Sequence, residues 1–127
     1  MPDFTAEFVA ACRRWKPEWN ESADDGQLWL WGCVVCRWVG GVREKRQGVY
    51  LDFSDDRASA DALVLLVQEL GRLGYLNIQF DDWGAPAADR IKLMATRTDD
   101  DQIHREGPTM IAAVARALMR AWEDVKP

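Results

Sequence analysis

Apolar residues recur three and four positions apart in three segments of the chain, a spacing that lines one face of a helix. These segments are residues 4–15, 54–73 and 108–125. The second begins at Asp55 and Asp56, whose charge suits the positive end of a helix dipole. The third begins at Pro108, because the first position of a helix needs no backbone N–H. We therefore expect three amphipathic helices.

Between these helices, apolar and polar residues alternate with a period of two, which is typical of strands with one buried face. The predicted strands cover residues 27–39, 42–53, 75–80 and 90–97. Gly40 and Gly41 join the first two strands, because a two-residue hairpin turn needs positive φ at both central positions. The stretch 98–107 is polar and contains three consecutive aspartates, so we expect a loop there.

The double-glycine turn predicts a register in which Leu30 faces Leu51 and Trp31 faces Tyr50. One face of this hairpin then carries Leu28, Leu30, Val34, Cys36, Val49, Leu51 and Phe53. The other face carries Trp29, Trp31, Cys33, Val35 and Tyr50. We take the aliphatic face as the core. In the strand over 75–80, the same alternation directs Leu76, Ile78 and Phe80 inward and Tyr75 outward.

The element order α-ββ-α-ββ-α predicts an α+β fold. We expect one four-stranded antiparallel sheet with helices packed on it, and a three-layer α/β/α sandwich is one form that this could take. A length of 127 residues fits a single domain over residues 1–127, large enough to bury a core without disulfides or metal.

The net charge and the cysteine content limit the classes of partner and the cellular compartment that we expect. The net charge of −5 disfavours direct nucleic-acid binding, and the basic residues Arg43, Lys45 and Arg46 are read as a solvated hairpin tip. An odd number of cysteines and a start without a basic or apolar leader indicate reduced thiols and a cytoplasmic location. Because no apolar run is long enough to span a bilayer, no membrane partner is expected.

Two stretches carry a resemblance to a known family: DALVLLVQELGRLGY over 61–75, and EGPTMIAAVARALMRA over 106–121. They resemble the phage ABA sandwich domain, a family of small proteins encoded by phages and prophages. The resemblance covers roughly the second half of the chain, and the tryptophan-rich hairpin departs from it. It implies a helix–sheet–helix sandwich, a phage origin and residence in the host cytoplasm, but it supplies no catalytic residue.

Candidate catalytic and metal-binding groups have simple structural explanations. Cys33 and Cys36 have the spacing of half a zinc site, but only Cys12 and His104 remain to complete it. On a strand, positions 33 and 36 also point to opposite faces. His104, the only histidine, is expected in a solvated loop. We therefore predict no catalytic residue, no metal ligand and no cofactor.

Clustered carboxylates leave one enzymatic alternative open. The clusters are Asp52 with Asp55 and Asp56, Asp81 with Asp82, and Asp99 to Asp101. Because divalent cations prefer several carboxylate oxygens, a metal-dependent hydrolase is the alternative function. None of the clusters has the spacing of an EF-hand, and helix capping explains Asp55 and Asp56.

Seven tryptophans are the most unusual feature of the composition. Trp29, Trp31 and Tyr50 are predicted to share the hairpin face opposite the core, where either the N-terminal helix covers them or they remain partly exposed. An exposed cluster would mark an interface. The leading hypothesis is a non-enzymatic, phage- or prophage-encoded module that binds a host or phage protein, for example to inhibit a host defence complex. Its predicted contact residues are Trp29, Trp31, Tyr50 and the loop residue Trp83.

Overall fold

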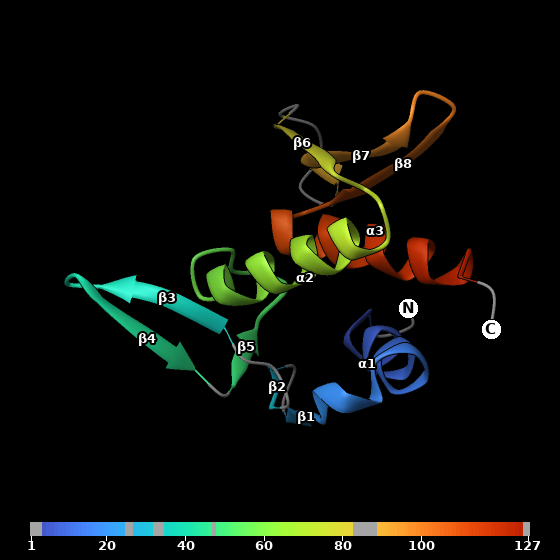
Figure 1. Ribbon diagram of the computed structural model, residues 1–127. Helices are drawn as coiled ribbons and strands as arrows, with labels where there is room; N and C mark the ends of the chain where they lie inside the picture. The colour runs from blue at the N-terminus through green and yellow to red at the C-terminus, as the bar shows by residue number, and fades with distance from the viewer. Residues whose placement is uncertain (1–3, 25–26, 32–34, 47, 83–88, 126–127) are drawn as a thin grey trace. The chain divides into compact units, whose positions relative to one another are not determined.

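A computed structural model describes residues 4–24, 27–31, 35–46, 48–82 and 89–125 (Figure 1). Helices alternate with groups of antiparallel strands, which confirms the α+β class. The chain divides into two compact units, Met1–Asp52 and Phe53–Pro127, and each unit has a three-stranded sheet of its own. None of the helices in the described ranges is long and apolar enough to cross a membrane.

The first unit begins with helix α1 (Phe4–Trp15), as predicted, followed by a short 3₁₀ helix, η1 (Pro17–Trp19). Its sheet has the order β1-β2-β5, built from β1 (Glu21–Asp24), β2 (Gln27–Leu30) and β5 (Val49–Leu51). Strands β3 (Val35–Val39) and β4 (Val42–Arg46) form a separate two-stranded ribbon. Strand β1 was not predicted.

The register of the long hairpin is confirmed near its turn and wrong at its base. In the ribbon, Arg37 lies opposite Glu44, as predicted, and Gly40 and Gly41 have φ of 56° and 80°. In the sheet, Trp29 rather than Trp31 lies opposite Tyr50. The cause is a mismatch in length, because residues 31–34 join β2 to β3 whereas only 47–48 join β4 to β5. The resulting shift of two positions preserves which residues share a face.

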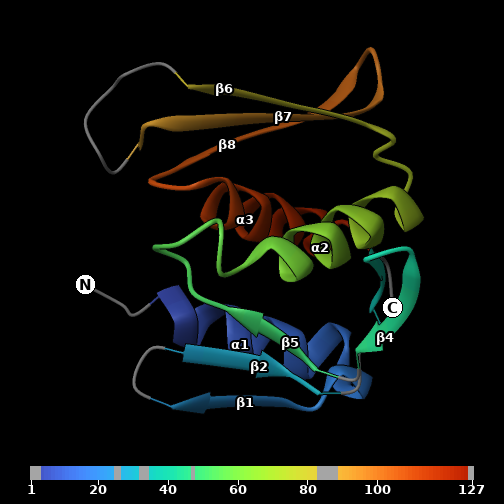
Figure 2. The same ribbon diagram turned by 90° about the vertical axis from the view of Figure 1, so that its left-hand side faces the viewer.

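The aliphatic face of this sheet is the core of the first unit, as predicted. Leu28, Leu30, Val49 and Leu51 are fully buried. Helix α1 lies along one face of the sheet and contributes the buried Phe8, Val9 and Cys12 (Figure 2). The buried aliphatic side chains therefore point toward α1, and the opposite face carries the aromatic residues.

The second unit contains two helices and a sheet of order β6-β7-β8. Its elements are α2 (Ala60–Arg72), β6 (Asn77–Asp82), β7 (Ile91–Thr98), β8 (Asp101–Gly107) and α3 (Met110–Glu123). The expected four-stranded sheet is not observed among the described residues: the chain has two three-stranded sheets and a ribbon. The second helix also begins later than predicted, after a turn over 53–59.

Strand β8 replaces the predicted loop over 98–107. Its only aliphatic side chain is Ile103, which is buried opposite Ala95 of β7. One apolar residue in seven gives too weak an alternation to predict a strand. Gly107 ends β8 against α3, where a Cβ would lie 3.0 Å from the backbone nitrogen of Ala113. The missing side chain therefore allows the helix to approach the strand closely.

Helix α3 packs on β7 and β8 and beside α2, so it is buried on more of its circumference than the predicted stripe. Ile111, Val114, Ala115, Leu118 and Trp122 are buried as expected. Four further alanines are also buried: Ala112, Ala113, Ala117 and Ala121. A small side chain suits these positions because neighbours lie on two sides of the helix.

Tyr75 and Leu76 have the reverse of their predicted exposure. Tyr75 is buried, whereas Leu76 is 85% exposed. Both residues follow Gly74 (φ 102°) and precede β6, so the strand alternation does not extend to them. The Tyr75 hydroxyl donates to Asp101 Oδ1 (3.4 Å), and the Arg97 guanidinium lies 5.2 Å from the ring centroid. Burial is the main cause that raises the pKa of Tyr75.

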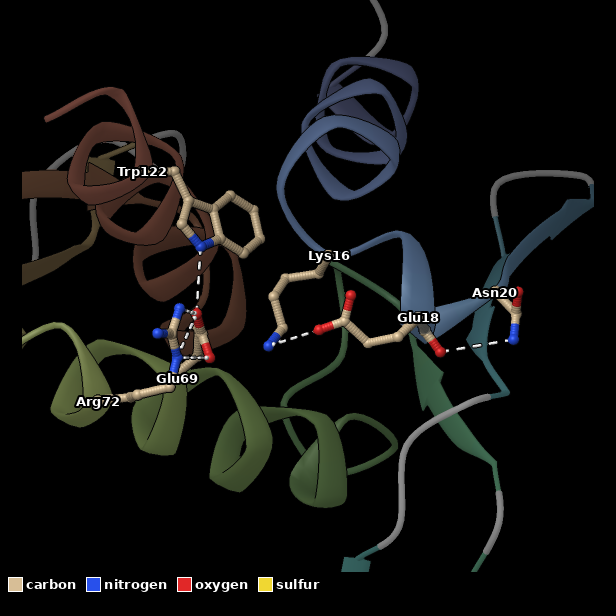
Figure 3. A network of polar contacts seen from close by, with 6 residues as sticks. All are labelled: Lys16, Glu18, Asn20, Glu69, Arg72 and Trp122. Atoms are coloured by element: carbon tan, nitrogen blue, oxygen red, sulfur yellow. Dashed lines mark hydrogen bonds and ion pairs between the residues drawn. The ribbon is translucent and has the colours of Figure 1, made fainter. Parts of the chain in front are cut away.

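A buried carboxylate joins α2 to α3. Glu69, on α2, is 5% exposed and accepts a hydrogen bond from Trp122 Nε1 of α3 (3.3 Å). The Arg72 guanidinium also donates to it, with Nε 2.9 Å from Oε2 (Figure 3). An ion pair and an indole N–H thus provide the partners that a buried carboxylate requires.

Candidate functional site

Trp29, Trp31 and Tyr50 form an aromatic cluster on the face of the first sheet that points away from α1. Trp29 comes from β2, Trp31 from the turn after it and Tyr50 from β5. The two indoles are stacked, with centroids 4.9 Å apart and an interplanar angle of 12°. Tyr50 lies against Trp29 at 5.2 Å and 60°. The structure thus brings together three of the four predicted contact residues, and Trp83 lies outside the described residues.

The sequence left open whether the N-terminal helix covers the aromatic cluster or leaves it partly exposed. The exposed fractions of the three side chains distinguish these two arrangements. Trp31 is 51% exposed, while Trp29 and Tyr50 are half-buried. Trp31 is one of the few large hydrophobic residues that are exposed in the described part of the chain. The cluster therefore keeps an open aromatic surface, and α1 does not cover it.

Gly48 shapes the cluster, although it was not among the predicted contact residues. A Cβ at this position would lie 3.1 Å from two carbons of the Trp31 ring and 3.5 Å from Trp29. The indole of Trp31 thus rests directly on the backbone at Gly48. The available signal was the placement of a glycine two residues before Tyr50, where alternation puts it on the aromatic face.

The stacking limits what the cluster can bind. Rings 4.9 Å apart leave no space for a ligand between them, so the indole pair is not a cage for a cation. What remains accessible is the outer surface of Trp31, backed by Trp29. A fixed, half-exposed tryptophan is a common centre of protein–protein interfaces, since it offers a large apolar area with little side-chain entropy to lose.

The carboxylates proposed for a metal-dependent hydrolase are dispersed over separate contacts. In the described ranges, no three His, Cys, Asp or Glu residues lie close enough to hold a metal ion. Asp55 and Asp56 accept backbone N–H groups, Asp82 pairs with Arg90, and Asp101 pairs with Arg97. Each of these described carboxylates thus takes part in a contact of its own.

Two single residues with candidate chemistry, His104 and Cys12, come from different elements. His104 is exposed on β8 rather than in a loop, with Nε2 3.2 Å from Oε1 of Gln102. Cys12 is buried in α1, and Cys33 lies outside the described residues. Arg43 is exposed beside the ribbon turn, consistent with a solvated tip.

A polar hollow of about 260 Å³ lies between β8 and the C-terminal end of α3. Its charged side chains include Asp101, Asp124, Arg105 and Arg120. Arg120 donates to Asp124 (2.8 Å), and this hydrogen bond raises the pKa of the guanidinium. Asp101 is bound by Arg97. Because both carboxylates are paired and the charges balance, the hollow does not select a ligand class.

No family model, no curated protein and no solved structure matches the chain. The resemblance to the phage ABA sandwich domain thus stays a prediction.

Proposed function

We propose that the chain is a protein-binding module whose contact surface is the aromatic cluster of Trp29, Trp31 and Tyr50. The observation that carries this proposal is the half-exposed Trp31 stacked on Trp29. Isolated apolar residues are common on protein surfaces, but a packed pair of indoles with one open ring is costly to leave in water. Burial by a partner would remove that cost.

The rigidity of the cluster supports the same function. Trp31 is held by Trp29 on one side and by the backbone at Gly48. A ring that is already fixed loses little freedom when a partner covers it, so more of the contact energy appears as affinity. A phage origin and the inhibition of a host defence complex rest on the family resemblance, and the partner we propose is accordingly a host or phage protein.

Capture of partners from a bacterial lysate by the tagged full chain tests this function. We expect Trp31→Ala to weaken capture about tenfold or more, as for interface hot spots. Val64→Ala is the matched control, because Val64 is 48% exposed but lies on α2. The stability of Trp31→Ala is measured alongside, and we expect a loss of about 1 kcal/mol or less for a half-exposed ring.

The Gly48→Ala variant changes the geometry of the aromatic cluster without removing any of its aromatic residues. The added methyl group would lie 3.1 Å from the Trp31 ring, so the ring must shift by a few tenths of an ångström while all three aromatic side chains remain. We expect weaker capture with little change in stability. If both cluster variants capture the same proteins as the wild type, the aromatic surface is not the contact site.

A further inference from the structure

The charge of the chain is unevenly distributed, and the ribbon of β3 and β4 carries its basic part. Residues 35–46 hold four basic residues and one acidic residue, a net charge of +3. The other residues of the chain together carry −8, within the total of −5. The total charge disfavours nucleic acid for the chain as a whole. A local basic element nevertheless attracts anions that come within about one Debye length, roughly 10 Å.

The register of the ribbon places its charges on different faces. Trp38 pairs with Arg43, and Cys36 pairs with Lys45. Because alternate positions of a strand belong to one face, these four residues share a face that has two cations and no carboxylate. Glu44, the single acidic residue of the ribbon, belongs to the other face. The ribbon therefore has one purely basic face.

The ribbon is open at its tip and belongs to neither three-stranded sheet (Figure 1). Arg43 is exposed, and Val42 beside it is 65% exposed. A Cβ at Gly40 or Gly41 would meet no atom within 4 Å. The turn and the residues that follow it are thus accessible to a large partner.

We propose that the ribbon binds double-stranded DNA in the major groove. This groove is about 12 Å wide and admits a two-stranded β-ribbon, whose strands lie about 5 Å apart. The five residue pairs of the ribbon extend about 17 Å along the groove. Duplex DNA carries one negative charge per about 1.7 Å of its axis, a denser line of charge than a protein surface of mixed sign offers. Shape and charge together favour duplex DNA over an acidic protein.

The expected binding is weak, sensitive to salt and independent of base sequence, because it depends on phosphates. A net charge of +3 corresponds to about three neutralised phosphates. The logarithm of the association constant should then fall with the logarithm of salt concentration with a slope of about −2.7. Since the rest of the chain is acidic, we expect a dissociation constant of about 10–100 µM at low salt.

Fluorescence anisotropy of a labelled DNA duplex of about two helical turns, titrated with the full chain, measures this binding. Arg43→Gln removes one cation from the basic face. We expect it to weaken binding about fivefold and to lower the magnitude of the salt slope by about one. Arg57→Gln is the matched control, because Arg57 is an exposed arginine in the turn before α2 and its loss changes the net charge equally. The control should keep the salt slope of the wild type.

Two other polyanions test the identity of the ligand. Duplex RNA of the same sequence should bind several-fold more weakly, because its major groove is too narrow to admit the ribbon. Poly-L-glutamate should also bind more weakly than the DNA duplex. The proposal is overturned if the wild type binds no duplex DNA at low salt at concentrations up to about 1 mM. Equal binding by Arg43→Gln and wild type, or RNA or polyglutamate bound as tightly as DNA, would overturn it as well.

Discussion

Glu69 shows how a single buried side chain connects two helices. Its carboxylate accepts from Trp122 Nε1 (3.3 Å) and from Arg72 Nε (2.9 Å) while only 5% of the residue is exposed. Removing the carboxylate would leave the buried indole N–H without its acceptor. The cost of an unsatisfied buried donor is larger than the net gain from a typical hydrogen bond.

We therefore expect Glu69→Ala to lower the free energy of unfolding by about 1–3 kcal/mol. Glu69→Gln should lose less, because its amide oxygen still accepts from Trp122. Urea denaturation monitored by tryptophan fluorescence measures both values. Gln68→Ala, an exposed neighbour on α2, is the control and should change stability little. Equal losses for Ala and Gln at position 69 would show that the charge, rather than the acceptor, stabilises this contact.

At the residue scale, the sequence predicted the buried aliphatic face of the first sheet well. Leu28, Leu30, Val49 and Leu51 are all fully buried, because side-chain alternation depends only on neighbouring positions. Alternation places Gly48 on the aromatic face, but the direct contact of its backbone with Trp31 could not be predicted. It depends on the shift in pairing between β2 and β5, which no local pattern reveals.

Two adjacent aspartates at the start of the second unit cap different elements. Oδ1 of Asp55 accepts from the backbone nitrogens of Arg57 (3.0 Å) and Ala58 (3.1 Å), which stabilises the local turn. Asp56 reaches α3, where its carboxylate accepts from Met110 (3.0 Å) and Ile111 (2.8 Å). The sequence predicted that both residues cap the second helix. Asp56 instead caps the third, more than fifty positions away.

The two aspartates form a matched pair for mutagenesis. Asp56→Ala should lower the free energy of unfolding by about 1–2 kcal/mol, because two backbone N–H groups at the N-terminus of α3 lose their acceptor. Asp55→Ala should cost about 0.5 kcal/mol, since its turn is exposed. Chemical denaturation of both variants gives the difference. Equal losses would contradict a special contribution from the contact between Asp56 and α3.

At the element scale, the three helices were predictable because their apolar stripes repeat over twelve or more residues. Short strands with polar composition were not. Strand β1 has the sequence ESAD and β8 has DQIHREG, so neither carries an alternation strong enough to exceed that of a loop. Their pairing depends on the neighbouring β2 and β7, which offer an edge to extend.

For the whole molecule, the single four-stranded sheet was the least accurate expectation. Each predicted hairpin is present at least in part, but each gains a third strand and none joins the other hairpin in the described residues. The sequence pattern indicates which residues point inward, yet it does not specify which strands become neighbours. This choice depends on contacts between segments that are distant in the sequence, and these contacts form within each of the two units, Met1–Asp52 and Phe53–Pro127.

Whether these units are independent domains is testable with a fragment of residues 53–127. Its first residues are tied to its last helix, because Thr109 Oγ1 donates to the carbonyl of Phe53 (2.6 Å) and Asp56 caps α3. We expect the fragment to show helical circular dichroism and a cooperative thermal transition, at a lower midpoint than the full chain. A fragment that lacks a cooperative transition would mean that residues 1–52 complete its core. The chain would then be the single domain that its length predicts.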